Sequence, residues 1–235
     1  MGLREKQATE RRDRILATAR KLIRQTGGTG FSMRALADEA EVSLATPYNL
    51  FGSKGGVLYA LLNASLENLD RATVTFSSTT PVERVLEVAG IAADVYARDA
   101  AFYRPLMQFL LGARDVEHRP RFIEQSLRRW TRTVQAAVRH GLLSSSVDVD
   151  LLARQLMINF IGVLDLWIHE ELDEDECRAQ SLYGSTLLML ANTSPVARPG
   201  LIKRLEAIER RLPRKLALPR EPVRGTRLRK RVRAA

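Results

Sequence analysis

Apolar residues recur along this chain of 235 residues at intervals of three and four. This spacing matches the turn of an α-helix, whereas a half-buried strand alternates apolar and polar residues at every second position. No stretch sustains such an alternation, and no segment repeats at a fixed interval. The sequence therefore predicts an all-α fold, and its length permits one large domain or two smaller ones.

Four amphipathic segments open the chain. The first covers residues 9–26 and is expected to end at Gly27, a typical C-terminal residue of helices. The next two are short, near residues 32–40 and 43–50, and the fourth is long. Each of these three follows a serine that can cap a helix N-terminus: Ser32, Ser43 and Ser53. Two short helices joined by a tight turn are typical of a helix-turn-helix, whose last helix enters the major groove of DNA.

The two short helices can be divided into an inner and an outer face. The residues expected to face the core or to fix the turn are Leu36, Ala37, Ala40, Val42 and either Leu50 or Phe51. The residues left outward on the third helix are Leu44, Ala45, Thr46, Pro47, Tyr48 and Asn49. These are uncharged and mostly small, which suits a surface that must approach base edges closely.

The same region carries a specific resemblance. The stretches FSMRALA at residues 31–37 and VSLATPYNLFGSK at residues 42–54 resemble the DNA-binding signature of the TetR family of transcriptional regulators. The resemblance covers residues 9–62 and implies a homodimer that binds a double-stranded DNA operator. It further implies a C-terminal helical domain for an unidentified small-molecule effector, which usually relieves repression. Dimerisation is expected through the helices at about 149–170 and 174–192.

The resemblance also implies roles for individual residues. It assigns phosphate contacts to Thr46, Tyr48 and Lys54, and it assigns base-facing or groove-edge positions to Arg34, Leu44, Ala45, Pro47 and Asn49. Arginine can bond guanine and asparagine can bond adenine through two hydrogen bonds, which agrees with these assignments. Ser32 and Ser43 complete the expected set. As caps, Ser32 and Ser53 would leave helix N-termini aimed at phosphate. Packing alone is the alternative for Tyr48, and a solvated charge is the alternative for Arg34.

Three features depart from the family pattern. Glu41 replaces the usual glycine of the turn, so we expect some strain if the backbone there is left-handed. Gly55 and Gly56 replace acidic helix-formers and should loosen the first turn of the fourth helix. Pro47 should remove one helical hydrogen bond if Ser43 caps its helix.

The remainder of the chain predicts five longer helices, at residues 82–98, 101–112, 120–140, 149–170 and 174–192, after a junction around residues 77–81. Residues 149–170 are apolar on nearly every side, which indicates burial by more than one domain. The resemblance implies that these helices surround an effector pocket. Its candidate lining residues, with core packing as the alternative, are Phe102, Tyr103, Met107, Phe109, Phe122, Trp130 and Asn159. Asp165 and His169 lie four residues apart, where a polar contact is favoured over a metal pair because no third ligand is evident.

Charge divides the chain into three expected regions. Residues 1–60, the helix-turn-helix domain, hold 10 basic and 6 acidic side chains; residues 61–197, the ligand-binding and dimerisation domain, hold 13 and 18; residues 198–235 hold 14 and 3. The last region predicts an amphipathic helix over residues 200–212, with membrane-surface attachment as an alternative, and disorder beyond about residue 213. Its basic tail could add sequence-independent affinity for DNA.

Other classes of protein find little support. Cys177 is the only cysteine, and the three histidines have no metal-ligand spacing: His118, His140 and His169. No phosphate-binding glycine loop is present, so we expect no enzyme, no cofactor and no metal. The most apolar stretch, residues 156–168, is short for a membrane span, and no secretory signal is evident, which predicts a cytoplasmic protein. An all-helical enzyme and a protein that coats DNA through its tail remain the alternatives to a regulator.

Overall fold

The computed structural model describes residues 2–75 and 81–213. Within these ranges it contains ten α-helices and no strand, which confirms the all-α prediction. The first four are α1 (Leu3–Thr26), α2 (Met33–Glu39), α3 (Ala45–Phe51) and α4 (Lys54–Thr75). The remaining six are α5 (Pro81–Ala97), α6 (Ala100–Gly112), α7 (Arg119–Arg139), α8 (Val149–Ile168), α9 (Glu174–Leu190) and α10 (Arg198–Glu209).

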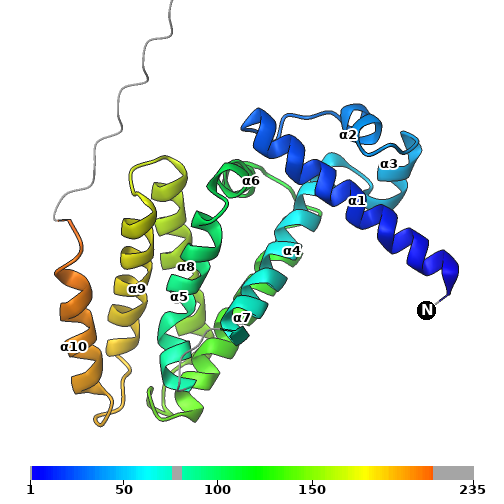
Figure 1. The fold of residues 1–235 in the computed structure, drawn as a ribbon. Coiled ribbons are helices and arrows are strands. Elements are labelled where there is room, and N and C mark those ends of the chain that lie inside the picture. The colour runs from blue at the N-terminus through cyan, green and yellow to red at the C-terminus, as the bar shows by residue number, and fades with distance from the viewer. Residues whose placement is uncertain (1, 76–80, 214–235) are drawn as a thin grey trace, which may run out of the picture.

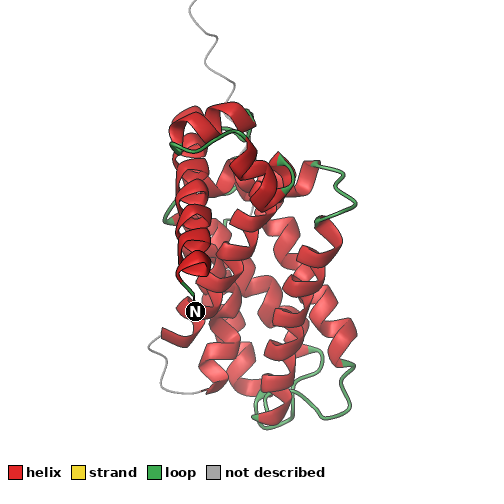
Figure 2. Cartoon of the chain, turned by 90° about the vertical axis from the view of Figure 1, so that its right-hand side faces the viewer, coloured by secondary structure: helices red, strands yellow, loops and turns green. Residues whose placement is uncertain are grey.

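The helices form a small N-terminal unit and a larger bundle. Helices α1, α2 and α3 lie together at one end, and α4 runs from them down into the bundle of α5 to α9 (Figure 1). Seen after a quarter turn, α1 rises from the marked N-terminus in front of the bundle (Figure 2). The boundary expected at residue 60 falls inside α4, which is continuous across it. One helix therefore belongs to both units and connects them mechanically.

Local capping confirms most of the expected helix ends. Gly27 ends α1 with a left-handed φ of 66°, and its N–H donates to the carbonyl of Ile23. The Ser32 hydroxyl accepts a hydrogen bond from the Ala35 N–H at 3.0 Å. The Ser53 hydroxyl accepts one from the Gly56 N–H at 3.1 Å. These bonds satisfy N–H groups that a helix start leaves without an intrahelical partner.

Helix α8 occupies the centre of the bundle, where it packs against α6, α7 and α9. Its length and hydropathy meet the criteria for a membrane span, although residues 156–168 alone looked too short. The buried core helix of a globular protein meets the same criteria, and most of the apolar side chains of α8 are covered by the protein. One stripe along α8 stays exposed, so its apolar surface is not buried on every side within the monomer.

Helix α10 folds back onto the bundle and lies along α9 (Figure 1). Leu201 and Ile208 are buried and Leu205 is half-buried, so this chain itself covers most of the apolar face expected for residues 200–212, while Ile202 stays 39% exposed. An ion pair of 2.6 Å joins Arg204 to Glu87 of α5, and Glu87 also pairs with Arg178 of α9 at 2.8 Å. The amphipathic helix is thus confirmed. The expected disordered tail and most of the expected junction at residues 77–81 lie outside the described residues.

Candidate DNA-binding surface and effector pocket

The turn between α2 and α3 has the left-handed backbone that the sequence suggested. Glu41 has a φ of 52°, in the region that favours glycine. The Val42 N–H donates to the Ala37 carbonyl at 3.0 Å, which closes the end of α2 in the way of a Schellman motif. Leu36, Ala37 and Ala40 are buried, as expected for the inner face of the motif.

The start of α3 differs from the expectation. Ser43 does not cap the helix, because α3 begins at Ala45 and no side chain caps it. The Ser43 hydroxyl instead forms a hydrogen bond of 2.8 Å with the Thr46 hydroxyl. Pro47 consequently lies in the first turn, where the N–H would have no intrahelical partner. The expected loss of one helical hydrogen bond at Pro47 was therefore wrong.

Burial separates the two faces of α3. Pro47 and Phe51 are buried, so the expectation that Pro47 faces the groove was wrong. The later start of the helix changes the rotation at which each side chain emerges. Arg12 of α1 holds this side of α3, with its guanidinium 4.6 Å from the centre of the Phe51 ring.

The opposite flank of α3 faces solvent. Leu44 is 40% exposed and Tyr48 is 47% exposed, and Ala45 and Asn49 are also exposed. Three further residues of the expected DNA-binding set are exposed: Ser32, Arg34 and Ser43. The other two, Thr46 and Lys54, are half-buried. Apart from Pro47, the expected DNA-binding residues therefore remain accessible.

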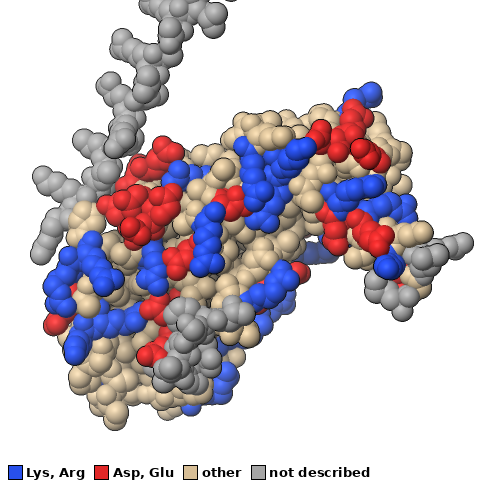
Figure 3. Space-filling model, viewed as in Figure 1, with Lys and Arg blue, Asp and Glu red and all other residues tan. Residues whose placement is uncertain are grey.

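The most acidic surface of the protein lies away from the exposed flank of α3. Acidic side chains gather over the turn between α8 and α9 and, in smaller groups, over the unit of α1 to α3, and basic side chains cover parts of α1 and α10 (Figure 3). The acidic group comprises six carboxylates within residues 170–176. This turn belongs to the bundle and not to the unit of α1 to α3 (Figure 1). The negative charge of the middle region is thus set apart from α3.

The two glycines at the start of α4 allow a close approach and do not loosen the turn as expected. A Cβ atom on Gly56 would lie 1.9 Å from the Phe51 carbonyl oxygen, which no real contact permits. A Cβ atom on Gly55 would meet a side-chain oxygen of Asp115 at 3.0 Å. The end of α3 therefore rests directly on the backbone of α4, and the two helices are held as one piece.

The loop between α6 and α7 touches α4 close to these glycines. His118 forms an ion pair of 3.2 Å with Asp115 when its ring is protonated, and the ring stacks on Tyr59 of α4 at 5.5 Å between centroids. Burial alone would raise the pKa of Asp115, but hydrogen bonds from His118 outweigh it and lower the pKa. Burial raises the pKa of Tyr59. The loop thus ties the bundle to the base of the helix-turn-helix.

A second tie joins α1 to the start of α6. Asp99 receives hydrogen bonds from Arg20 at 2.9 Å and from Arg24 at 2.6 Å. The Arg20 guanidinium also lies 4.2 Å from the centre of the Phe102 ring. Burial alone would raise the pKa of Asp99, but the hydrogen bonds from Arg24 and Arg20 outweigh it and lower the pKa. The ionised carboxylate therefore stabilises the contact between the two units.

Replacing Asp99 with asparagine should destabilise the protein by about 1 kcal/mol at neutral pH, since both arginines are partly exposed and solvent weakens the pairs. A lowered pKa adds stability above the ordinary pKa of an aspartate, and this stability is lost as the pH falls. The difference between wild type and D99N in thermal unfolding should therefore shrink below about pH 4. A difference that stays constant down to pH 3 would contradict this role.

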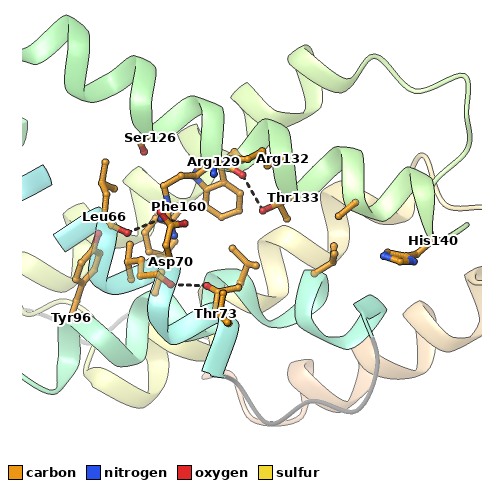
Figure 4. Close-up of a pocket in the computed structure, with 17 residues that line it drawn as sticks. Leu66, Asp70, Thr73, Tyr96, Ser126, Arg129, Arg132, Thr133, His140 and Phe160 are labelled. Carbon is orange, nitrogen blue, oxygen red and sulfur yellow. Dashed lines mark hydrogen bonds and ion pairs between the residues drawn. The ribbon is translucent and has the colours of Figure 1, made fainter. Parts of the chain in front are cut away.

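A pocket of about 510 Å³ opens in the bundle between α4, α5, α7 and α8. Its walls are mainly apolar, and its polar groups lie on α4, α5 and α7 (Figure 4). The lining residues include Leu66, Leu69, Asp70, Thr73, Val85, Val88, Tyr96, Arg129, Trp130, Thr133 and Phe160. This size and polarity are typical of sites for small organic ligands. Among the described residues, no three histidine, cysteine, aspartate or glutamate side chains gather as a metal site would require.

Of the side chains expected to line an effector pocket, only Trp130 does so. The others do not line it: Phe102, Tyr103, Met107, Phe109, Phe122 and Asn159. Phe102, Tyr103, Met107 and Phe122 are buried in the core, and Phe109 packs edge-on against Tyr59. Asn159 faces α9, where a Cβ atom on Gly184 would collide with its amide.

The pocket residues that the sequence analysis missed include Tyr96, Arg129 and Asp70. Arg129 of α7 donates to the Leu66 carbonyl of α4 at 2.7 Å and forms an ion pair with Asp70 of the same helix. Burial lowers the pKa of Arg129, and the charge of Asp70 opposes this effect. The arginine is 59 positions from its partner in sequence, so no local pattern could have revealed the pair.

A helix-turn-helix with an exposed recognition flank, joined by one helix to a helical domain that contains a pocket, defines a class of DNA-binding regulator. Residues 15–61 match the family described as bacterial regulatory proteins of the tetR family. The N-terminal domain therefore matches that family, and the chain as a whole shares its fold with solved TetR-family regulators. The resemblance inferred from residues 31–54 is thereby confirmed.

Solved structures with the same fold extend the likeness over most of the chain. A TetR-family regulator from Syntrophomonas wolfei is 20% identical, with a TM-score of 0.63 over 77% of this chain and 95% of that one. TylP from Streptomyces fradiae is 16% identical, with a TM-score of 0.62 over 87% and 98%. SmeT, the repressor of a multidrug efflux pump of Stenotrophomonas maltophilia, is 20% identical, with a TM-score of 0.61 over 79% and 92%. A search of curated proteins returned no significant match.

Proposed function

We propose that this protein is a homodimeric cytoplasmic repressor. In this proposal α3 of each subunit enters the major groove of a near-palindromic operator, and a small molecule in the pocket of the bundle releases the DNA. The proposal includes no enzymatic activity and no cofactor. Its main support is the exposed flank of α3, where Tyr48 and Asn49 project from a helix whose opposite side is fixed by Pro47 and Phe51.

The exposed residues suit the two kinds of DNA contact. Tyr48, Thr46 and Lys54 carry groups that can bind phosphate, and they fix the position of the protein without reading sequence. Asn49 and Arg34 carry groups that can form paired hydrogen bonds with adenine and guanine. Leu44 and Ala45 can pack against thymine methyl groups, and Ser32 and Ser43 lie exposed at the starts of the two helices.

Dimerisation is assigned to α8 and α9. The exposed stripe of α8 follows a spacing of three and four residues and contains Leu151, Gln155, Ile158, Gly162 and Asp165. Leu187 of α9 is exposed as well. A Cβ atom on Gly162 would meet nothing within 4 Å, so the surface there has room for a close partner. Two copies of this face would form a four-helix contact and set the spacing of two α3 helices.

The effector pocket connects to the DNA-binding surface through α4. The C-terminal half of α4 supplies Leu66, Leu69 and Asp70 to the pocket, and its N-terminal turn carries the end of α3 at Gly56. A ligand that prefers one position of α4 would shift the population of that position. The spacing of the two α3 helices, about 34–36 Å on successive major-groove faces, would change with it.

An electrophoretic mobility shift with DNA from upstream of the gene tests the proposal. We expect a complex of two subunits per site that resists unlabelled competitor DNA of unrelated sequence. The tail beyond residue 213 could contribute sequence-independent binding, so the experiment should also be performed on a chain that ends there. Binding that shows no sequence preference in either form would count against a repressor of this kind.

Replacing Asn49 with alanine should weaken operator binding roughly 10- to 100-fold, because a paired contact with a base contributes about 1–3 kcal/mol of discrimination. The same change should relax sequence preference at one position of each half-site. Gln125 is an exposed amide on α7, far along the chain from α3, and Q125A is the matched control. Equal losses in N49A and Q125A would contradict a base contact by Asn49.

A further inference from the structure

We propose that the effector is an amphipathic carboxylate, whose charged group binds Arg129 and whose apolar body lies along α7. This inference rests on the proposed function and deepens it, because it names the chemical class of the ligand. Its basis is the arrangement of donors, acceptors and apolar walls in the pocket between α4, α5, α7 and α8 (Figure 4).

The walls require a mostly apolar ligand. Side chains from four helices supply them, among them Leu69, Val85, Val88, Ala92, Trp130 and Phe160. A ligand covered with hydroxyl groups would lose its hydration against these side chains without gaining hydrogen bonds. Sugars and nucleotides are therefore unsuited to this pocket.

Both threonine hydroxyls of the pocket already donate to backbone carbonyls, so they offer a ligand only their acceptor lone pairs. The Thr73 hydroxyl already donates to the Leu69 carbonyl at 2.8 Å, and the Thr133 hydroxyl donates to the Arg129 carbonyl at 3.1 Å. Among the described lining residues, Asp70 is the one carboxylate, whereas Arg129 and Arg132 are both cations. The lining thus holds one more cation than carboxylates, which favours a ligand with a single negative charge. The cation without an ion pair in this part of the lining, Arg132, is exposed, so the better-covered site for that charge is Arg129.

Arg129 is placed to hold such a group. Its side chain is only 15% exposed, so a charge pair there is weakly screened by solvent. Both of its contacts with α4 use the same nitrogen, Nη1. Within the described residues Nη2 and Nε have no partner, and these two N–H groups form an edge of the guanidinium that matches a carboxylate.

A charged ligand on Arg129 would also act on α4. The same guanidinium ties α7 to the Leu66 carbonyl and to Asp70, both on α4. A second carboxylate beside it shares the positive charge and weakens the hold on Asp70. Because α4 carries α3 at Gly56, this one residue links recognition of the ligand to the DNA-binding surface.

The length of the pocket sets the size of the apolar body. His140 lies at the far end of the pocket from Asp70 and Arg129 (Figure 4). Eleven helical steps separate Arg129 from His140 on α7 and its C-terminal cap, which is about 16 Å at 1.5 Å per residue. A straight-chain acid of medium length fits this span, so decanoate is a suitable probe.

Binding can be measured on the protein without DNA, by the quenching of tryptophan fluorescence. Trp130 lines the pocket, and Trp167 is the only other tryptophan of the chain. We expect decanoate to bind at least tenfold more tightly than decanol or γ-decanolactone, which have similar apolar bodies and no charge. A DNA-binding experiment without ligand is independent of this measurement, so failure of the proposed function and failure of this inference can be told apart.

Two variants should change the affinity for decanoate in opposite directions. R129M should reduce it to that of decanol and leave the affinity for decanol unchanged. D70N removes the competing carboxylate and should tighten decanoate severalfold, a gain that a merely damaged fold cannot produce. R128M is the matched control, because Arg128 is exposed and pairs with Glu124 outside the pocket. The R128M protein should bind decanoate as tightly as wild type does.

Three results would overturn the inference. They are equal binding of decanoate and decanol, tighter binding of the lactone than of decanoate, and no binding of decanoate to the wild-type protein. If R129M fails to fold, D70N still decides the question, because unchanged or weaker binding of decanoate by D70N contradicts competition for Arg129.

Discussion

Replacing Gly56 with alanine should lower the melting temperature by about 10 °C and abolish operator binding. A Cβ atom at this position lies 1.9 Å from the carbonyl oxygen and 3.0 Å from the carbonyl carbon of Phe51. These are backbone atoms at the end of α3, so no side-chain rotation can relieve the overlap. We expect a cost of roughly 3 kcal/mol, at the upper end of that for overpacked sites, which corresponds to the stated shift for a chain of this length.

The sign of the change in melting temperature shows whether packing or helix propensity dominates at Gly56. Gly56 lies in the first turns of α4, and an alanine there would by propensity alone stabilise the helix by about 1 kcal/mol. Gly55 is the matched control, because its added Cβ meets side-chain oxygens of Asp115 and Ser53, which can shift by a few tenths of an ångström. G55A should stay within about 1 kcal/mol of wild type. A G56A protein that melts at or above the wild-type temperature would contradict the close approach of α3 and α4.

The G56A variant also tests how a movement of α4 at the pocket would reach α3. If the end of α3 rests on the backbone of α4, any displacement of α4 moves α3, and with it the exposed flank of α3, by the same amount. Tyr59 and His118 reinforce this point one turn further on, where the loop before α7 stacks on α4. Gel-shift measurements should therefore show loss of sequence-selective binding in G56A even at temperatures where its α-helical circular dichroism is retained.

The helices themselves could be predicted from the sequence. Their apolar spacing and their caps are local properties, so α5 to α9 begin and end within about two residues of the expected positions. Gly27, Ser32 and Ser53 end or cap helices as expected for the same reason. The TetR signature could be recognised because the helix-turn-helix is itself a local motif.

The parts that could not be predicted depend on rotation and on distant contacts. A start of α3 at Ala45 without a cap from Ser43 turns Pro47 toward the core, and no spacing rule distinguishes the two starts. Gly56 looked like a weak helix residue, because the carbonyl of Phe51 that requires it is visible only in three dimensions. The pocket candidates were named because they lie on the helices that the resemblance places around a ligand. The polar centre of the pocket is instead Arg129, whose partner lies on another helix.

Replacing Ile158 with glutamate should convert the dimer into a monomer and weaken operator binding at least a hundredfold. Ile158 is 51% exposed in the middle of the exposed stripe of α8. In I158E a dimer through this stripe would bury two carboxylates, one from each subunit, in a closed interface. A dimer gains affinity because its second α3 binds at a high effective concentration, typically worth 10²- to 10⁴-fold. Separating the subunits removes this gain and leaves each recognition helix unchanged.

The matched control for this change is V196E. Val196 is 94% exposed in the loop between α9 and α10, outside the proposed dimer face. Glutamate there should change neither the number of subunits in the assembly nor its affinity for DNA. Sedimentation equilibrium should show a dimer for wild type and V196E, and a monomer for I158E with its helical circular dichroism retained. A dimeric I158E protein with wild-type operator affinity would mean that the subunits meet through another surface, and that the exposed stripe of α8 serves a different partner.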